Sequence, residues 1–133
     1  SFKMKLVVAA FIGALFMFFG VLLGALGSHA LEEKLSQDSL NSFMIAIRYM
    51  MFHGLALLVL SAFPFIPENS KEWIALAFVV GTTLFSISIL LLSTKTIHGL
   101  PVSFLGPITP IGGLFLLVGW GYLSFQLFKA LWT

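Results

Sequence analysis

The stretch KLVVAAFIGALFMFFGVLLGALG, from Lys5 to Gly27, decides the fold of this chain. After Lys5 it contains no charged residue, and it is longer than the roughly 20 residues that a helix needs to cross a hydrocarbon core of about 30 Å. Further apolar stretches of similar length run approximately from Phe43 to Phe63, from Trp73 to Ser93 and from Ile111 to Leu131. The sequence therefore predicts four transmembrane helices.

Composition supports a membrane protein and excludes several other classes. Of the 133 residues, 59% are hydrophobic and 9% are charged, whereas an ordinary soluble domain has about 25% charged residues. The absence of cysteine excludes disulfides and thiolate chemistry. The net charge of +2 comes without any basic run, so no nucleic-acid partner is predicted. We expect the lipid bilayer as the environment, and no cofactor.

Short polar segments separate the apolar stretches, and short connections force consecutive helices to lie antiparallel. We therefore predict an all-α fold, an integral membrane antiparallel four-helix bundle with short loops. It would form a single transmembrane domain over residues 1–133. The helices are expected near residues 5–29, 41–63, 72–94 and 107–131.

Four antiparallel helices place both termini on one side of the membrane. That side carries Lys3, Lys5, Lys71 and Lys129. The opposite side carries Lys34 and Lys95, so the positive-inside rule places the termini in the cytoplasm. Trp73 and Trp132 would lie at the same interface, where an aromatic belt is expected.

Small residues recur in the first and last helices. Gly20 and Gly24 have a spacing that lets another backbone approach closely, and the last helix contains Gly112, Gly113, Gly119 and Gly121. We interpret this pattern as packing within one chain. A homo-oligomer is the alternative.

Arg48 lies within the apolar segment IAIRYMMFH, from Ile45 to His53. A guanidinium cannot lose its charge and is costly in hydrocarbon, so Arg48 needs a partner. His53 would lie near the middle of the membrane, with Tyr49 one turn away on the same face. Arg48 lies roughly 140° from His53 around the helix axis and points elsewhere.

The segment LGPITPIGG, from Leu105 to Gly113, opens the last helix on the outer side. Pro107 and Pro110 have no N–H to donate, so an irregular start with free carbonyls is expected. We predict a polar cluster of Arg48, Thr109 and the backbone around Gly106 and Pro107. Two interpretations stay open: the cluster locks the bundle, or it lines a ligand site.

Other polar residues give weaker signals. His29 with Glu33 and His98 is a conceivable metal site, but the spacing is not diagnostic and no metal is predicted. For His53, a proton-relay role is the alternative to an ordinary buried, hydrogen-bonded histidine. Most hydroxyls of the third helix should bond back to the backbone or across to a neighbour, and Trp120 should pack in the core. Because no catalytic triad or carboxylate pair lies within the membrane, we do not expect an enzyme.

Three separated segments carry a resemblance to a known family: LGALGSHAL (23–31), RYMMFHGLAL (48–57) and LGPITPIGG (105–113). The chain resembles the small bacterial inner-membrane family of unknown function that bears number 423, which is similar to eukaryotic transmembrane protein 256. The resemblance implies a four-span protein of the bacterial inner membrane with no assigned activity. It implies that His29, Arg48 and His53 belong to the family signature, and it transfers no catalytic residue.

The sequence thus favours a non-enzymatic membrane protein with a polar pocket on the outer side. The pocket would bind or pass a small molecule, a lipid headgroup or an ion. Arg48 favours an anionic lipid or solute, with His29, Tyr49, His53 and Thr109 around it. The alternative is a structural or assembly protein whose polar cluster only locks the helices.

Overall fold

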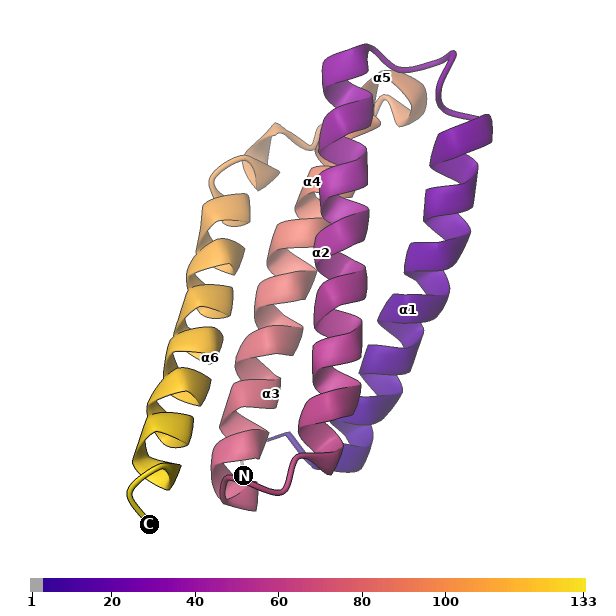
Figure 1. Cartoon of the computed structure of the whole chain (residues 1–133). Helices are drawn as coiled ribbons and strands as arrows, with labels where there is room; N and C mark the ends of the chain where they lie inside the picture. The colour runs from indigo at the N-terminus through magenta and orange to yellow at the C-terminus, as the bar shows by residue number, and fades with distance from the viewer. Residues whose placement is uncertain (1–3) are drawn as a thin grey trace.

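The computed structural model describes residues 4–133, and every regular element among them is helical. Lys3, which the topology prediction used, lies outside the described residues. Helices α1, α2 and α6 each extend from one end of the bundle to the other. The remaining span is continuous and consists of α3, the π-helical turn η1 and α4 (Figure 1). The bounds are Leu6–His29 (α1), Gln37–Ala62 (α2), Glu68–Thr82 (α3), Thr83–Ile87 (η1), Ser88–Ser93 (α4), Lys95–His98 (α5), Ser103–Leu105 (the 3-10 turn η2) and Ile108–Ala130 (α6). The predicted all-α membrane bundle is confirmed.

Polar capping turns extend the helices beyond the apolar stretches that mark them in the sequence. Helix α2 begins at Gln37 rather than near residue 41, because the Ser36 hydroxyl accepts a hydrogen bond of 3.1 Å from the Ser39 N–H. Such a cap supplies one of the partners that the first turn of a helix lacks. Helix α3 similarly begins at Glu68, after Pro67, rather than near residue 72. Apolar length alone misses these turns.

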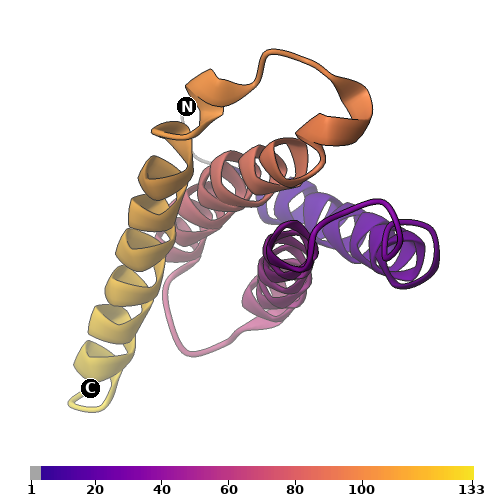
Figure 2. The same ribbon diagram turned by 90° about the horizontal axis from the view of Figure 1, so that it is seen from above.

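The helices form an open arrangement rather than a closed square. Helix α1 packs along α2, α6 packs along α3 and η1, and α2 lies against α3, η1 and α4. Within residues 4–133, the backbone of α6 does not closely approach that of α1 or α2. Seen from above, α1 and α6 lie on opposite sides of the molecule (Figure 2). Any contact between α2 and α6 is therefore made by side chains alone.

Glycines set the two closest helix crossings. A Cβ on Gly13 of α1 would lie 2.7 Å from the carbonyl oxygen of Gly54 on α2. On the other side of the bundle, a Cβ on Gly81 of α3 would lie 3.0 Å from the carbonyl oxygen of Gly112 on α6. Gly13 and Gly112 thus serve packing within one chain, as the sequence indicated for the first and last helices, whereas a Cβ on Gly121 would meet nothing within 4 Å.

The buried core is small and the apolar outer surface is large. Phe78, Leu57 and Ile74 are among the fully buried side chains. Of the most apolar windows of α1 and α6, only 22% is buried inside the protein. Since lipid tails are as apolar as leucine, these faces are suited to contact with hydrocarbon.

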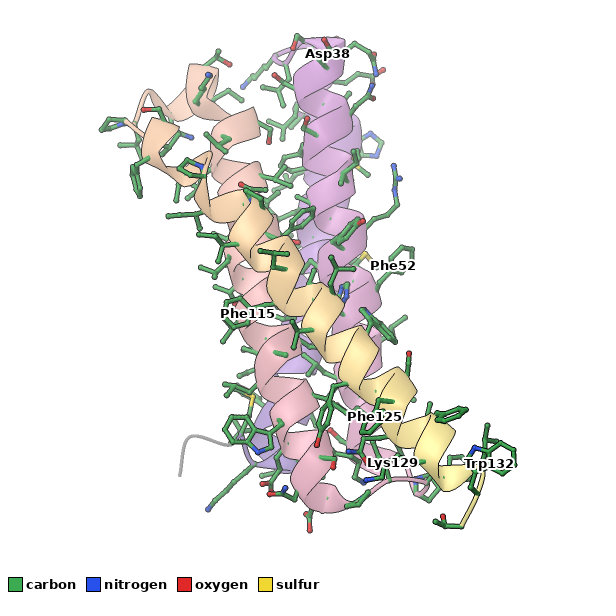
Figure 3. The ribbon with its side chains drawn as sticks, turned by 90° about the vertical axis from the view of Figure 1, so that its left-hand side faces the viewer. Asp38, Phe52, Phe115, Phe125, Lys129 and Trp132 are labelled. Carbon is green, nitrogen blue, oxygen red and sulfur yellow. The ribbon has the colours of Figure 1, made fainter. Side chains whose placement is uncertain are left out.

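The two ends of the bundle differ in the charged residues they carry. Helix α1 begins and α6 ends at the same end of the bundle (Figure 1). Figure 3 shows Lys129 and Trp132 at this end and Asp38 at the opposite one. The end that carries Asp38 is called the distal end below.

Candidate binding groove

His53 of α2 bridges to α6 through its imidazole ring. The side chain is 5% exposed. Its Nδ1 donates to the carbonyl oxygen of Tyr49 at 2.7 Å, and its Nε2 accepts from the indole Nε1–H of Trp120 at 3.0 Å. A carbonyl only accepts and an indole N–H only donates, so the ring is neutral with its proton on Nδ1. This bridge joins two helices whose backbones do not meet.

Aromatic rings surround this bridge. The rings of Tyr49 and His53 are stacked with centroids 6.0 Å apart, as their placement on one face of the helix predicts. The ring centroid of Phe85, in η1, lies 4.6 Å from that of Tyr49, and the ring centroid of Phe78 lies 4.8 Å from that of Trp120. The expectation that Trp120 packs in the core is wrong, because Trp120 is 43% exposed and extends between the helices to reach His53.

Two clefts lie on either side of Trp120. The middle cleft has a volume of about 460 Å³ and is lined by Tyr49, His53, Phe85, Trp120 and residues of α6 from Pro110 to Leu117. The apolar cleft has a volume of about 350 Å³ and is lined by Phe52, Leu55, Ala56, Val59, Leu60, Phe63, Phe78, Trp120 and Leu123. Both are therefore bounded by α2 and α6, with the Trp120 ring between them.

A third cleft continues this line to the distal end. The outer cleft has a volume of about 430 Å³ and is lined by Asp38, Ser39, Ser42, Ile89, Leu92, Ser93, Lys95, Gly106 and Thr109. The outer and middle clefts are lined by consecutive residues of α6, Thr109 in the outer cleft and Pro110 in the middle one. We call the outer, middle and apolar clefts together the α2–α6 groove. The groove is polar at its distal end and apolar at the other.

Arg48 does not join the cluster that the sequence predicted. Its side chain is exposed and makes no hydrogen bond or ion pair within residues 4–133. Arg48 is displaced by about 100° around α2 from Tyr49, which lines the middle cleft. The side chain therefore points away from the start of α6 and toward the surroundings of the bundle.

The irregular segment before α6 forms as its prolines predict. The turn η2 precedes α6, and the Thr109 hydroxyl donates to the carbonyl oxygen of Leu105 at 3.1 Å. Gly106 and Thr109 line the outer cleft, whereas Pro107 is exposed and lines none of the three clefts. The Leu105 carbonyl thus has a local partner rather than Arg48.

His29 lies apart from the groove, exposed in the last turn of α1. His98, its conceivable metal-binding partner, has both ring nitrogens in use. Its Nε2 donates to the Leu91 carbonyl at 2.8 Å, and its Nδ1 accepts from the Leu100 N–H at 3.0 Å. Among the residues that the structure describes, no three His, Asp or Glu side chains are grouped as a metal site requires.

The π-helical turn is a feature that the sequence did not reveal. Thr82, which precedes the turn, and Ser86, which lies within it, are fully buried, and their hydroxyl oxygens have no hydrogen-bond partner among the described residues. This corrects the expectation for these two hydroxyls, although Ser93 and Thr94 do bond back to the carbonyl of Leu90. Such turns are often found at functional sites, and here Phe85 from the turn lines the middle cleft.

The fold and the groove define a small four-span integral membrane protein. The chain belongs to the protein family of unknown function DUF423, whose sequence profile matches residues 23–113. The UPF0382 membrane protein of Staphylococcus haemolyticus is 35% identical over 118 residues, which cover 89% of this chain and 93% of that protein. The UPF0382 membrane protein C1782.12c of Schizosaccharomyces pombe is 39% identical over 107 residues, covering 74% and 82%. No solved structure matches the chain.

Proposed function

We propose that this protein is a non-enzymatic, multi-pass protein of the bacterial inner membrane that holds a membrane amphiphile in the α2–α6 groove. One observation carries the proposal: the groove changes from polar at the distal end to apolar beyond Trp120. An amphiphile has the same gradient, with a headgroup at one end and a hydrocarbon chain at the other.

The polar groups within the groove support binding rather than catalysis. Both nitrogens of His53 are engaged, one with a carbonyl and one with an indole N–H. The hydroxyls of Ser93 and Thr109 also donate to backbone carbonyls. A mostly apolar cleft with a few fixed polar groups is typical of a binding site for a small molecule.

The orientation follows from the lysines at the two ends of the bundle. Lys5, Lys71 and Lys129 belong to the end where α1 begins and α6 ends, and Trp73 and Trp132 are exposed there, whereas Lys34 and Lys95 belong to the distal end. By the positive-inside rule this end faces the cytoplasm. The distal end, and with it the polar part of the groove, then faces outward.

A second candidate function, assembly with another membrane protein, is favoured by Arg48. A guanidinium that is exposed on a membrane helix and has no partner within the described chain is suited to an acidic partner helix or a lipid phosphate. Replacement of Arg48 by Met should then shift the protein to a smaller assembly in size-exclusion chromatography with light scattering. An unchanged mass would leave lipid as the partner of Arg48.

Trp120 provides a direct test of groove binding. In a variant with Trp73→Phe and Trp132→Phe, Trp120 is the only indole left, and it borders both the middle and the apolar cleft. Titration in detergent with a phospholipid that has brominated acyl chains should quench its fluorescence saturably at one lipid per chain. A quench that rises linearly without saturation would contradict the proposal.

Two glycines of α6 provide a matched pair of variants for this test. Gly113 lines the middle cleft, and the nearest atom to a Cβ there is 3.8 Å away. A Cβ on Gly121 meets nothing within 4 Å. Gly113→Phe should fill the cleft and abolish saturable quenching, whereas Gly121→Phe should preserve it.

A further inference from the structure

The outer cleft contains one acidic and one basic side chain that are free to meet a ligand. Asp38, in the first turn of α2, and Lys95, at the start of α5, both line this cleft and are exposed. Neither forms an ion pair within residues 4–133. The cleft therefore offers two opposite charges at the polar end of an otherwise apolar groove.

The hydroxyls of the outer cleft divide into acceptors and free donors. Ser93 and Thr109 already donate to the carbonyls of Leu90 and Leu105, so they offer only lone pairs to a ligand. The carboxylate of Asp38 likewise only accepts. Lys95 only donates, through its three ammonium hydrogens, and the Ser42 hydroxyl has no hydrogen bond within the described residues. The cleft thus presents acceptors for a cation together with donors for an anion.

We infer that the ligand of the groove is a zwitterionic phospholipid whose headgroup bears a primary ammonium, as in phosphatidylethanolamine. The inference rests on the proposed function and deepens it. The ammonium would donate to Asp38 and to the lone pairs of Ser93 and Thr109, and the phosphate would accept from Lys95. The acyl chains would run along the middle and apolar clefts toward Leu123.

This arrangement distinguishes between headgroups by charge and by hydrogen bonding. A quaternary ammonium, as in phosphatidylcholine, has no N–H to donate to Asp38. An anionic headgroup such as phosphatidylglycerol keeps the contact of its phosphate with Lys95, but it gives the Asp38 carboxylate no cation. A charge-assisted hydrogen bond is roughly twice as strong as a neutral one, so the primary ammonium should be preferred.

The test uses the variant in which Trp120 is the single tryptophan. It is titrated with three brominated-chain lipids that have ethanolamine, choline and glycerol headgroups. The Kd for the ethanolamine lipid should be lower by about tenfold, which corresponds to roughly 1.4 kcal/mol. Asp38→Asn should remove the preference over the glycerol lipid. Lys95→Gln should weaken the binding of all three lipids, because all three contain the phosphate. Glu32→Gln and Lys34→Gln, which change exposed charges outside the groove, should leave all three values unchanged.

The outcomes separate this inference from the proposed function. Saturable quenching with equal Kd values for the three headgroups, or with the tightest value for the glycerol lipid, would overturn the inference and leave groove binding intact. The absence of saturable quenching with every headgroup would overturn both. A preference for ethanolamine that survives Asp38→Asn would also overturn the assignment of the ammonium to Asp38.

Discussion

The indole N–H of Trp120 donates to Nε2 of His53 across the gap between α6 and α2, at 3.0 Å. The bond divides the groove, because Trp120 borders a cleft on each side. Both polar groups are satisfied by it, so neither the His53 ring nor the Trp120 indole presents an unpaired donor or acceptor to the groove. A hydrocarbon chain can then lie beside the bridge without stranding a donor or an acceptor.

Removal of the bridging donor should destabilise the protein modestly. Trp120→Phe leaves His53 Nε2 without its partner, at an expected cost of about 0.5–1.5 kcal/mol in the free energy of unfolding. Unfolding in mixed detergent micelles measures this change. Trp132→Phe, at a side chain that is 76% exposed, is the control and should have no effect. Equal stability of both variants would show that the bridge contributes nothing.

A methyl group at the crossing of α6 with α3 should be poorly tolerated. A Cβ on Gly112 would meet the backbone nitrogen of Phe85 and would lie 2.8 Å from the carbonyl oxygen of Gly81. Backbone atoms cannot move aside cheaply, so Gly112→Ala should lower the free energy of unfolding by about 1–3 kcal/mol. Gly121→Ala, which meets open space, should be neutral or slightly stabilising. A neutral Gly112→Ala would show that the helices are farther apart than described.

The buried hydroxyl of Thr82 should be dispensable for stability. Thr82→Val keeps the shape of a side chain that is fully buried and removes a hydroxyl without a partner. Stability should stay the same or rise by about 1 kcal/mol, because a buried unsatisfied group costs roughly that amount or more. Thr94→Val provides the contrast, since it removes a bond of 2.7 Å to the Leu90 carbonyl. A marked loss with Thr82→Val would reveal a partner of this hydroxyl, such as a buried water.

Arg48 should contribute little to the stability of the isolated chain. Arg48→Met preserves much of the side-chain volume and breaks no hydrogen bond within residues 4–133, so the free energy of unfolding should change by less than about 0.5 kcal/mol. Lys71→Met is the comparison, because Lys71 Nζ donates to the Phe63 carbonyl at 2.7 Å. A large loss with Arg48→Met would restore the interpretation that Arg48 locks the bundle.

The helices could be predicted from the sequence because each is a property of one segment. Apolar length marks the spans, short loops make them antiparallel, and the spacing of Tyr49 and His53 places both on one face. The small residues of the first and last helices likewise indicated close packing. The family resemblance rested on three segments of the same chain, and the comparisons confirm it.

The groove could not be predicted, because it depends on which helices meet. In a soluble bundle the apolar stripe of each helix shows which side is buried, but a membrane helix is apolar on its lipid face as well. The sequence therefore does not indicate that the backbones of α2 and α6 lie apart. The indole N–H of Trp120 was the one available signal, since an indole within the membrane usually has a hydrogen-bond partner. The π-helical turn at Thr83–Ile87 has no recognisable sequence pattern.

Native mass spectrometry of the purified protein beside its Gly113→Phe and Gly121→Phe variants shows directly whether the α2–α6 groove holds a lipid. The unmodified chain and Gly121→Phe should each retain a single phospholipid after detergent removal, and Gly113→Phe should retain none. Retention of the same lipid by Gly113→Phe, or the absence of lipid from all three proteins, would contradict the claim that the α2–α6 groove holds a membrane amphiphile.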